Sequence, residues 1–157
     1  MKLLKIDMRS LTVKEDDVAK YKRLGGRALT SKIILDEVPA TCHPLGENNK
    51  LVIATGLLTG SGASSADRYS IGAKSPLTGG IKESNAGGIT GLTLGKLGIR
   101  ALVFENIRED FKIVHISKNG VKFDDATSIL GKDLSEAATW LRDTYGKHVA
   151  VWLIGVA

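Results

Sequence analysis

The chain has 157 residues, of which 43% are hydrophobic and 25% charged, so it can form a folded domain without disulfides or structural metals. Its net charge of +5 would suit an anionic partner, but the basic residues are scattered and aromatic residues make up only 5%, so we expect no nucleic-acid binding. One cysteine, no basic-then-apolar leader and only short apolar runs predict a cytoplasmic protein that does not enter a membrane.

The first segment predicts a hairpin followed by a helix. Residues 3–8 alternate loosely between apolar and polar and indicate a strand, and residues 11–14 can pair back onto it after Ser10. Apolar residues at helical spacing predict a helix over 16–24. We expect Gly25-Gly26 to end it, because glycine tolerates the left-handed conformation found at helix ends.

A longer helix is predicted over residues 27–38. It has one apolar face, formed by Leu29, Ile33, Ile34 and Val38. Pro39 ends this helix, because the residue before a proline avoids the helical conformation. A polar loop over 40–49 then leads to a short, buried strand at 51–55.

The middle of the chain is rich in glycine: 11 of the 18 glycines lie between residues 56 and 98. This stretch also contains a predicted strand at 69–73 and a predicted helix at 89–97, and it lacks the repetition of a flexible linker. We therefore expect ordered loops whose backbone approaches something closely.

The last third predicts more strands and one further helix. The strands are at 100–105, 111–117, 121–123 and 149–154. Asn119-Gly120 predicts a hairpin turn, since both turn positions need a positive φ. A helix is expected over 133–145, capped by Asp133 with Glu136 as its reciprocal partner and ended by Gly146. Adjacent hairpins mixed with helices favour an α+β fold over a doubly wound sheet.

Common catalytic and ligand-binding patterns are missing. No P-loop is present, and Gly60-Ser61-Gly62 has only the first two glycines of a dinucleotide fingerprint. The three histidines, His43, His115 and His148, are far apart, so they do not suggest a metal site. Cys42 and His43 are adjacent in a loop, which is poor geometry for a nucleophile and its base. We predict no catalytic residue in the chain.

Four segments carry a more specific signal. They are GGRAL (25–29) with LDEVP (35–39), PLG (44–46) with NKLV (49–52) and ATGLLTG (54–60), RYS (68–70) with AKSPLTGG (73–80), and ESNAGG (83–88). In this order and spacing they closely resemble the N-terminal domain of the aldehyde ferredoxin oxidoreductase family. The resemblance covers nearly the whole chain.

This resemblance implies an α+β fold and a single tungstopterin-binding domain over 1–157. Members of the family hold tungsten between two molybdopterins beside a [4Fe–4S] cluster, oxidise aldehydes to carboxylic acids and pass the electrons to ferredoxin. The four cluster cysteines belong to later domains, so the chain should be inactive alone. Its expected partners are those domains and ferredoxin, with self-association through uncovered apolar surface. The alternative is a stand-alone module that binds a pterin, a phosphate or a protein.

The resemblance also assigns a candidate site. Arg68 matches the family arginine that touches the pterin and approaches the cluster. Asn85 matches the asparagine beside the pterin phosphates, whose backbone carbonyl can help to hold a bridging magnesium ion. Gly87 matches a backbone position in contact with the pterin, and Ser84 and Ala86 are its neighbours. Glycines suit a flat ligand because they leave the backbone bare.

Each of these residues also has a purely structural alternative. Arg68 can form a surface ion pair with Asp67 or Glu83. Asn85 can occupy a left-handed turn, and Gly87 can be an ordinary glycine at the start of a helix.

The chain also departs from the family pattern. The tryptophan and glycine that open the family sequence are missing, and Cys42-His43 replaces more polar loop residues. Val156 stands where the family has a proline. Lys74 and Ser75 lie in a matching motif, but a structural role in the turn at Pro76 is equally consistent with it.

Overall fold

The computed structural model describes residues 1–155 and contains two compact units, one over Met1–Arg108 and one that begins at Glu109. Val156, the residue in the place of the family proline, lies outside the described residues. The mixture of sheets and separate helices confirms the predicted α+β fold.

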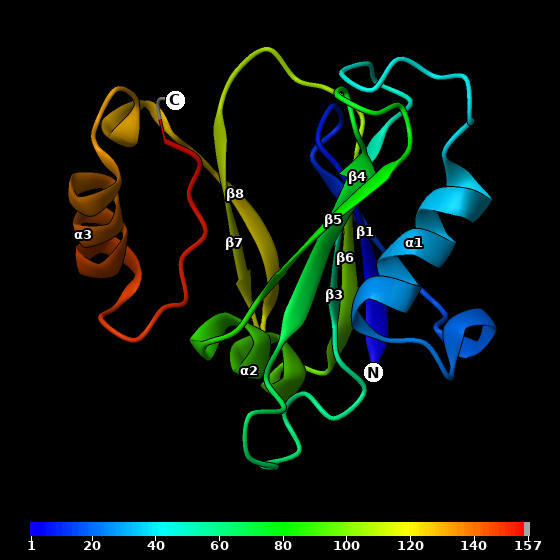
Figure 1. Cartoon of the computed structure of the whole chain (residues 1–157). Coiled ribbons are helices and arrows are strands. Elements are labelled where there is room, and N and C mark those ends of the chain that lie inside the picture. The colour runs from blue at the N-terminus through cyan, green and yellow to red at the C-terminus, as the bar shows by residue number, and fades with distance from the viewer. Residues whose placement is uncertain (156–157) are drawn as a thin grey trace. The chain divides into compact units, whose positions relative to one another are not determined.

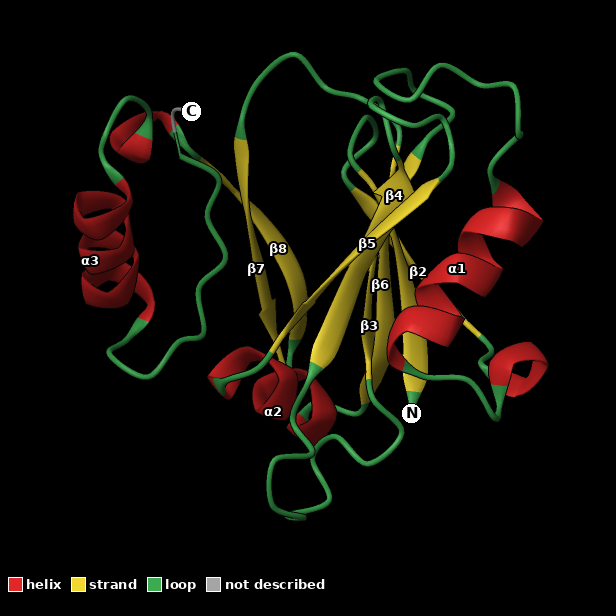
Figure 2. Cartoon of the chain, viewed as in Figure 1, coloured by secondary structure: helices red, strands yellow, loops and turns green. Residues whose placement is uncertain are grey.

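The first unit contains a six-stranded sheet in the order β2-β1-β6-β3-β4-β5 (Figure 1; β2 is labelled in Figure 2). Its strands are β1 (Lys2–Asp7), β2 (Thr12–Asp16), β3 (Lys50–Thr55), β4 (Tyr69–Lys74), β5 (Ile81–Ala86) and β6 (Ile99–Glu105). Only β1 and β6 pair in parallel; every other neighbouring pair is antiparallel. The order makes β5 an edge strand, and it inserts β6, the last strand of this unit in the sequence, between β1 and β3.

Helix α1 (Gly26–Glu37) covers one face of this sheet and contacts β3, β4 and β5 (Figure 1). The predicted apolar face is confirmed, since Leu29, Ile33, Ile34 and Val38 are all buried in the core. The helix approaches β4 closely because Gly72 has no side chain: a Cβ there would lie 2.9 Å from Cβ of Thr30.

Helix α2 (Ile89–Lys96) packs against the glycine-rich loop that precedes β4. A Cβ added to Gly91 would lie 2.2 Å from the carbonyl oxygen of Asp67, and one added to Gly95 would lie 2.8 Å from that of Thr59. The expectation of closely approaching loops is therefore confirmed, but at these positions the backbone meets protein rather than a ligand.

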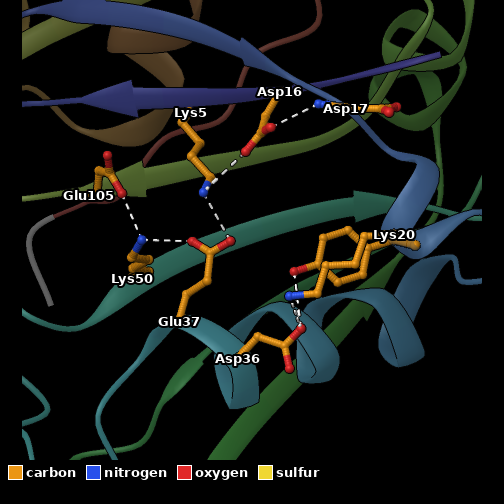
Figure 3. A network of polar contacts seen from close by, with 9 residues as sticks. Lys5, Asp16, Asp17, Lys20, Asp36, Glu37, Lys50 and Glu105 are labelled. Atoms are coloured by element: carbon orange, nitrogen blue, oxygen red, sulfur yellow. Dashed lines mark hydrogen bonds and ion pairs between the residues drawn. The ribbon is translucent and has the colours of Figure 1, made fainter.

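A chain of ion pairs joins the C-terminal end of α1 to the sheet (Figure 3). The Nζ atom of Lys5 lies 3.3 Å from Oδ2 of Asp16 and 3.0 Å from Oε1 of Glu37. The Nζ atom of Lys50 lies 2.8 Å from Oε2 of Glu37 and 2.7 Å from Oε2 of Glu105. The network thus connects β2, β1, α1, β3 and β6.

The second unit contains a hairpin of β7 (Lys112–Ser117) and β8 (Gly120–Asp125), followed by helix α3 (Leu134–Tyr145) (Figure 2). The predicted hairpin is confirmed, and so is Asp133 as the cap of α3, since it accepts a 2.8 Å hydrogen bond from the backbone N–H of Glu136. The reciprocal bond to the Glu136 side chain is not found among the described residues. At the other end of α3 the Tyr145 hydroxyl donates a 2.7 Å hydrogen bond to Asp124, and its ring lies 4.8 Å from the ring of His115.

Three local predictions are wrong. Residues 16–24 form only a 3-10 turn at Ala19–Tyr21, because Asp16 belongs to β2 and the side chain of Asp17 accepts a hydrogen bond from the N–H of Ala19. Gly25-Gly26 begins α1 instead of ending a helix. The apolar run over 149–154 is not a strand and pairs with none in the described part of the chain.

Candidate cofactor-binding site

The five predicted site residues lie at one end of the β4–β5 pair. Arg68 directly precedes β4, Ser84, Asn85 and Ala86 end β5, and Gly87 follows. The antiparallel register sets Ser70 opposite Asn85 and Tyr69 opposite Ala86, which brings Arg68 beside the end of β5. Because β5 is an edge strand, alternate backbone N–H and C=O groups point away from β4 and are open to a ligand.

Arg68 and Asn85 are joined by a hydrogen bond. The Nε atom of Arg68 donates to Oδ1 of Asn85 at 2.5 Å. The amide nitrogen of Asn85 in turn donates to the carbonyl oxygen of Tyr69 at 3.2 Å and to the hydroxyl of Ser70 at 3.0 Å. A Cβ added to Gly87 would lie 3.6 Å from Nη1 of Arg68, so the guanidinium passes next to this glycine.

The strand separates the candidate residues into two groups. Side chains alternate along β5, and Asn85 lies on the face that α1 covers, because its partner Ser70 approaches Gly26 of that helix. Ser84 and Ala86 point to the opposite face. The structure therefore brings Arg68, Asn85 and Gly87 together and leaves the side chains of Ser84 and Ala86 apart from them.

The structural alternatives for Arg68 and Asn85 do not hold in the described part of the chain. Asp67 accepts a hydrogen bond from the N–H of Gly60 at 2.9 Å, and Glu83 pairs with Arg27, so neither acid forms an ion pair with Arg68. Asn85 lies within β5 and has no positive φ.

An open hollow of about 400 Å³ lies beside Arg68. It is lined by Ser65, Asp67, Arg68, Gly87, Gly88, Ile89 and Leu92. The predicted site included Arg68 and Gly87 of this lining, and it missed Ser65 and Asp67, which come from the loop before β4, and Ile89 and Leu92, which come from α2. Gly88 has a φ of +108° and precedes α2 without any side-chain cap, so the first N–H groups of that helix have no partner within it. Such groups favour an anion.

Lys74 and Ser75, in contrast, have structural roles. The Nζ atom of Lys74 donates to the carbonyl oxygens of Ala40 and Cys42, which anchors the loop after α1. The hydroxyl of Ser75 accepts from the N–H groups of Leu77 and Thr78 and so closes the turn at Pro76.

Two kinds of feature are not found among the described residues. Within residues 1–155, no group of three His, Cys, Asp or Glu side chains is placed to hold a metal ion. None of the helices in this part of the chain has the length and apolarity needed to cross a membrane.

Comparison with known proteins identifies the family of the chain. The family described as "Aldehyde ferredoxin oxidoreductase, N-terminal domain" matches residues 3–157. A tungsten-containing aldehyde ferredoxin oxidoreductase of Pyrococcus furiosus is 38% identical over 144 residues, which are 91% of this chain and 24% of that protein. The enzyme of the same name from Pyrococcus horikoshii is 35% identical over 161 residues, or 99% of this chain and 26% of that protein.

Other relatives carry different names. A Pyrococcus furiosus protein named "Aliphatic sulfonate oxidoreductase, WOR-like subunit" is 34% identical over 137 residues, covering 83% of this chain and 22% of that protein. Among solved structures, the active site complex BamBC of benzoyl coenzyme A reductase matches with a TM-score of 0.85 and 26% identity, over 92% of this chain and 22% of that one. The chain thus spans about a quarter of the relatives that it matches.

Proposed function

The chain belongs to the aldehyde ferredoxin oxidoreductase family, and from this we propose that it is the part of such an oxidoreductase that binds a tungsten bis-molybdopterin cofactor. The observation that carries the proposal is the convergence of Arg68, Asn85 and Gly87 at the open edge of β5. The arginine has no carboxylate partner in the described structure, and the strand edge offers free backbone groups. These features fit a flat ligand that carries a phosphate.

The proposal gives separate roles to the cofactor, to the residues of this chain and to the rest of the oxidoreductase. The cofactor would supply the two-electron redox chemistry that oxidises an aldehyde to a carboxylic acid. Arg68 and Gly87 would contact the pterin, Asn85 would lie beside its phosphate and offer its backbone carbonyl to magnesium, and the backbone around Ser84 and Ala86 would line the strand edge. A [4Fe–4S] cluster and the contact with ferredoxin would come from the part of the relatives that this chain does not span. We place the protein in the cytoplasm and expect self-association of the chain alone.

The proposal is tested by cofactor retention. The purified chain is mixed with molybdopterin and desalted, and the pterin that stays bound is measured by fluorescence after oxidation. We expect retention by the natural chain and loss in Arg68→Ala. If neither the natural chain nor Arg68→Ala retains pterin, the proposal is contradicted.

Inactivity is tested separately. The chain supplied with cofactor should show no dye-linked oxidation of aldehydes, because one cysteine cannot bind a four-cysteine cluster. Turnover above a heat-killed control would overturn this part of the proposal.

A stand-alone pterin- or phosphate-binding module is the second candidate. It is favoured by the position of the whole site within the first unit. The reading frame beyond residue 157 separates the two: a continuation with a cluster-type cysteine set supports the oxidoreductase, and a stop codon supports the module.

A further inference from the structure

Two arginines are held in the same way by alternate residues of β5. The Nε atom of Arg27 lies 2.9 Å from Oε2 of Glu83, and the Nε atom of Arg68 lies 2.5 Å from Oδ1 of Asn85. Glu83 and Asn85 are two residues apart on one face of the strand, which separates the two anchors by about 7 Å. In the described structure neither arginine uses its terminal nitrogens in another bond, so the terminal nitrogens of both guanidinium groups are left available.

The start of α1 lies beside this pair. A Cβ added to Gly26 would be 3.5 Å from the hydroxyl of Ser70, and this hydroxyl is bonded to the side chain of Asn85. The N-cap residue, Gly25, has no side chain to cap the helix, and the first turn has no acidic residue. Its free N–H groups therefore add positive potential to that of the two arginines.

Glu83 is arranged to position Arg27. Its side chain is only 10% exposed, whereas that of Arg27 is 75% exposed. Oε2 of Glu83 holds the arginine, and Oε1 is buried without a partner in the described structure. A buried carboxylate with one partner contributes little to folding, because its desolvation offsets the attraction. Its consequence is instead a fixed direction for the Arg27 guanidinium.

We propose that Arg27 and Arg68 together bind the phosphate group of a phosphorylated ligand, with Glu83 and Asn85 as positioning residues. Planar guanidinium groups bind phosphate oxygens in pairs, and two of them can share one dianion. The ligand's identity as a pterin rests on the proposed function, whereas the anchoring of Arg27 and Arg68 to alternate residues of β5 does not. The GGRAL segment, which includes Arg27, thereby acquires a role in the same site as the ESNAGG segment.

The test is an NMR titration of the 157-residue chain with inorganic phosphate at constant ionic strength. The Nε–Hε signals of both arginines should shift with one common Kd. Arg68→Ala should raise this Kd roughly tenfold to hundredfold, as expected for loss of a charge-assisted hydrogen bond. The double variant Arg27→Gln/Glu83→Gln should raise the Kd by a similar factor. Both residues are changed because removing Arg27 alone would leave the Glu83 carboxylate buried without a partner. Glu83→Gln alone should raise the Kd about twofold to tenfold.

Two further variants make the result decisive. Lys14→Gln removes one positive charge on β2, at the opposite edge of the sheet, and should leave the Kd unchanged. If the double variant does not fold, Arg27→Lys replaces it, because lysine keeps the charge but lacks the planar fork, and we expect a rise of about tenfold.

The outcomes are distinguishable. Phosphate binding that depends on Arg68 but is unchanged in the Arg27 variants overturns the inference and leaves the proposed function intact. Shifts of both arginines in a chain that retains no pterin overturn the proposed function and leave the phosphate site. Absence of any shift in the natural chain overturns the inference.

Discussion

The guanidinium of Arg68 donates from Nε to Oδ1 of Asn85 across the end of the β4–β5 pair, at 2.5 Å. Both groups are exposed, and Asn85 keeps its bonds to Tyr69 and Ser70 when Arg68 is removed. Arg68→Ala should therefore lower the free energy of unfolding of the chain by less than about 1 kcal/mol. In the complete oxidoreductase the same change should reduce tungsten content, because a charge-assisted contact to the cofactor is lost.

Both quantities are measured on one substitution, by thermal unfolding and by metal analysis. Arg23→Ala is the control, since Arg23 is also exposed and forms no hydrogen bond or ion pair in the described residues. A sharply lower melting temperature with unchanged tungsten content would show that Arg68 is structural.

Gly91 lies where α2 comes closest to its neighbouring loop, and we expect a change from glycine to alanine there to lower stability instead of raising it. An alanine in place of a glycine within a helix usually stabilises it by about 1 kcal/mol. At Gly91 the added Cβ would lie 2.2 Å from the backbone oxygen of Asp67, so Gly91→Ala should instead destabilise the chain by about 1–3 kcal/mol. Urea unfolding measures the difference. Gly80→Ala, where the nearest atom is 3.7 Å away, should be tolerated, and a stabilised Gly91→Ala would contradict the packing described for α2.

The ion-pair network predicts how stability depends on pH. Partial burial acts to raise the pKa of Glu37, but its bonds to Lys50 and Lys5 outweigh this and lower the pKa. The folded state therefore gains stability from Glu37 above the ordinary pKa of glutamate and loses it as the pH falls through the lowered value. For Lys5 and Lys50, burial opposes the effect of the neighbouring carboxylates, yet the pKa is raised, so their contribution is lost only at alkaline pH.

Glu37→Gln should cost about 1–2 kcal/mol near neutral pH, between the values of exposed and of buried ion pairs. From about pH 7 to about pH 3 the variant should lose less stability than the natural chain. Urea unfolding at both pH values provides the measurement. Glu15→Gln removes a more exposed pair with Lys2, 3.4 Å apart, and should have little effect. If Glu37→Gln and the natural chain lose the same amount of unfolding free energy on acidification, the stabilising role of the Glu37 carboxylate is disproved.

A tyrosine attaches the end of α3 to the hairpin. Burial and the Asp124 carboxylate raise the pKa of Tyr145 to about 12, which keeps its hydroxyl protonated as a donor. The stabilisation by this bond is complete below the ordinary pKa of tyrosine and is lost as the pH rises through about 12. Asp124→Asn should lower the pKa, as seen by phenolate absorbance. Burial also raises the pKa of Tyr21, so a second tyrosine ionises at high pH. The variant Tyr145→Phe shows which step in the phenolate titration belongs to Tyr145. An unchanged titration in Asp124→Asn would rule out the role of its charge.

Much of the fold could be predicted because its elements have strong local patterns. The helix over 27–38 has a regular apolar face and a proline after it, and the Asn119-Gly120 hairpin has a turn that few residues can form. β5 could not be predicted, because this edge strand has mostly exposed and polar residues and so lacks alternation. The strand predicted over 149–154 was wrong because an apolar run forms a strand only where another strand is available to pair with it.

The site was accessible from sequence only through its resemblance to a family. Arg68, Asn85 and Gly87 stand in matching motifs, and the structure brings them together, although their contact with a cofactor stays a prediction. The pairing of Arg27 with Glu83 joins residues 56 positions apart, and no local pattern signals such a contact.

The position of β6 in the sheet has a consequence for synthesis on the ribosome. The β1–β2 hairpin and the β3–β4–β5 meander share no strand pairing, and β6 is the strand that pairs with both. A nascent chain that ends before residue 99 therefore lacks the strand pairing between the two halves of the sheet, and each half has an unpaired edge where β6 will lie. The contacts between β1 and β6 span almost the whole unit and are slow to form, so the chain is most exposed to chaperones and to misassembly until β6 emerges and inserts.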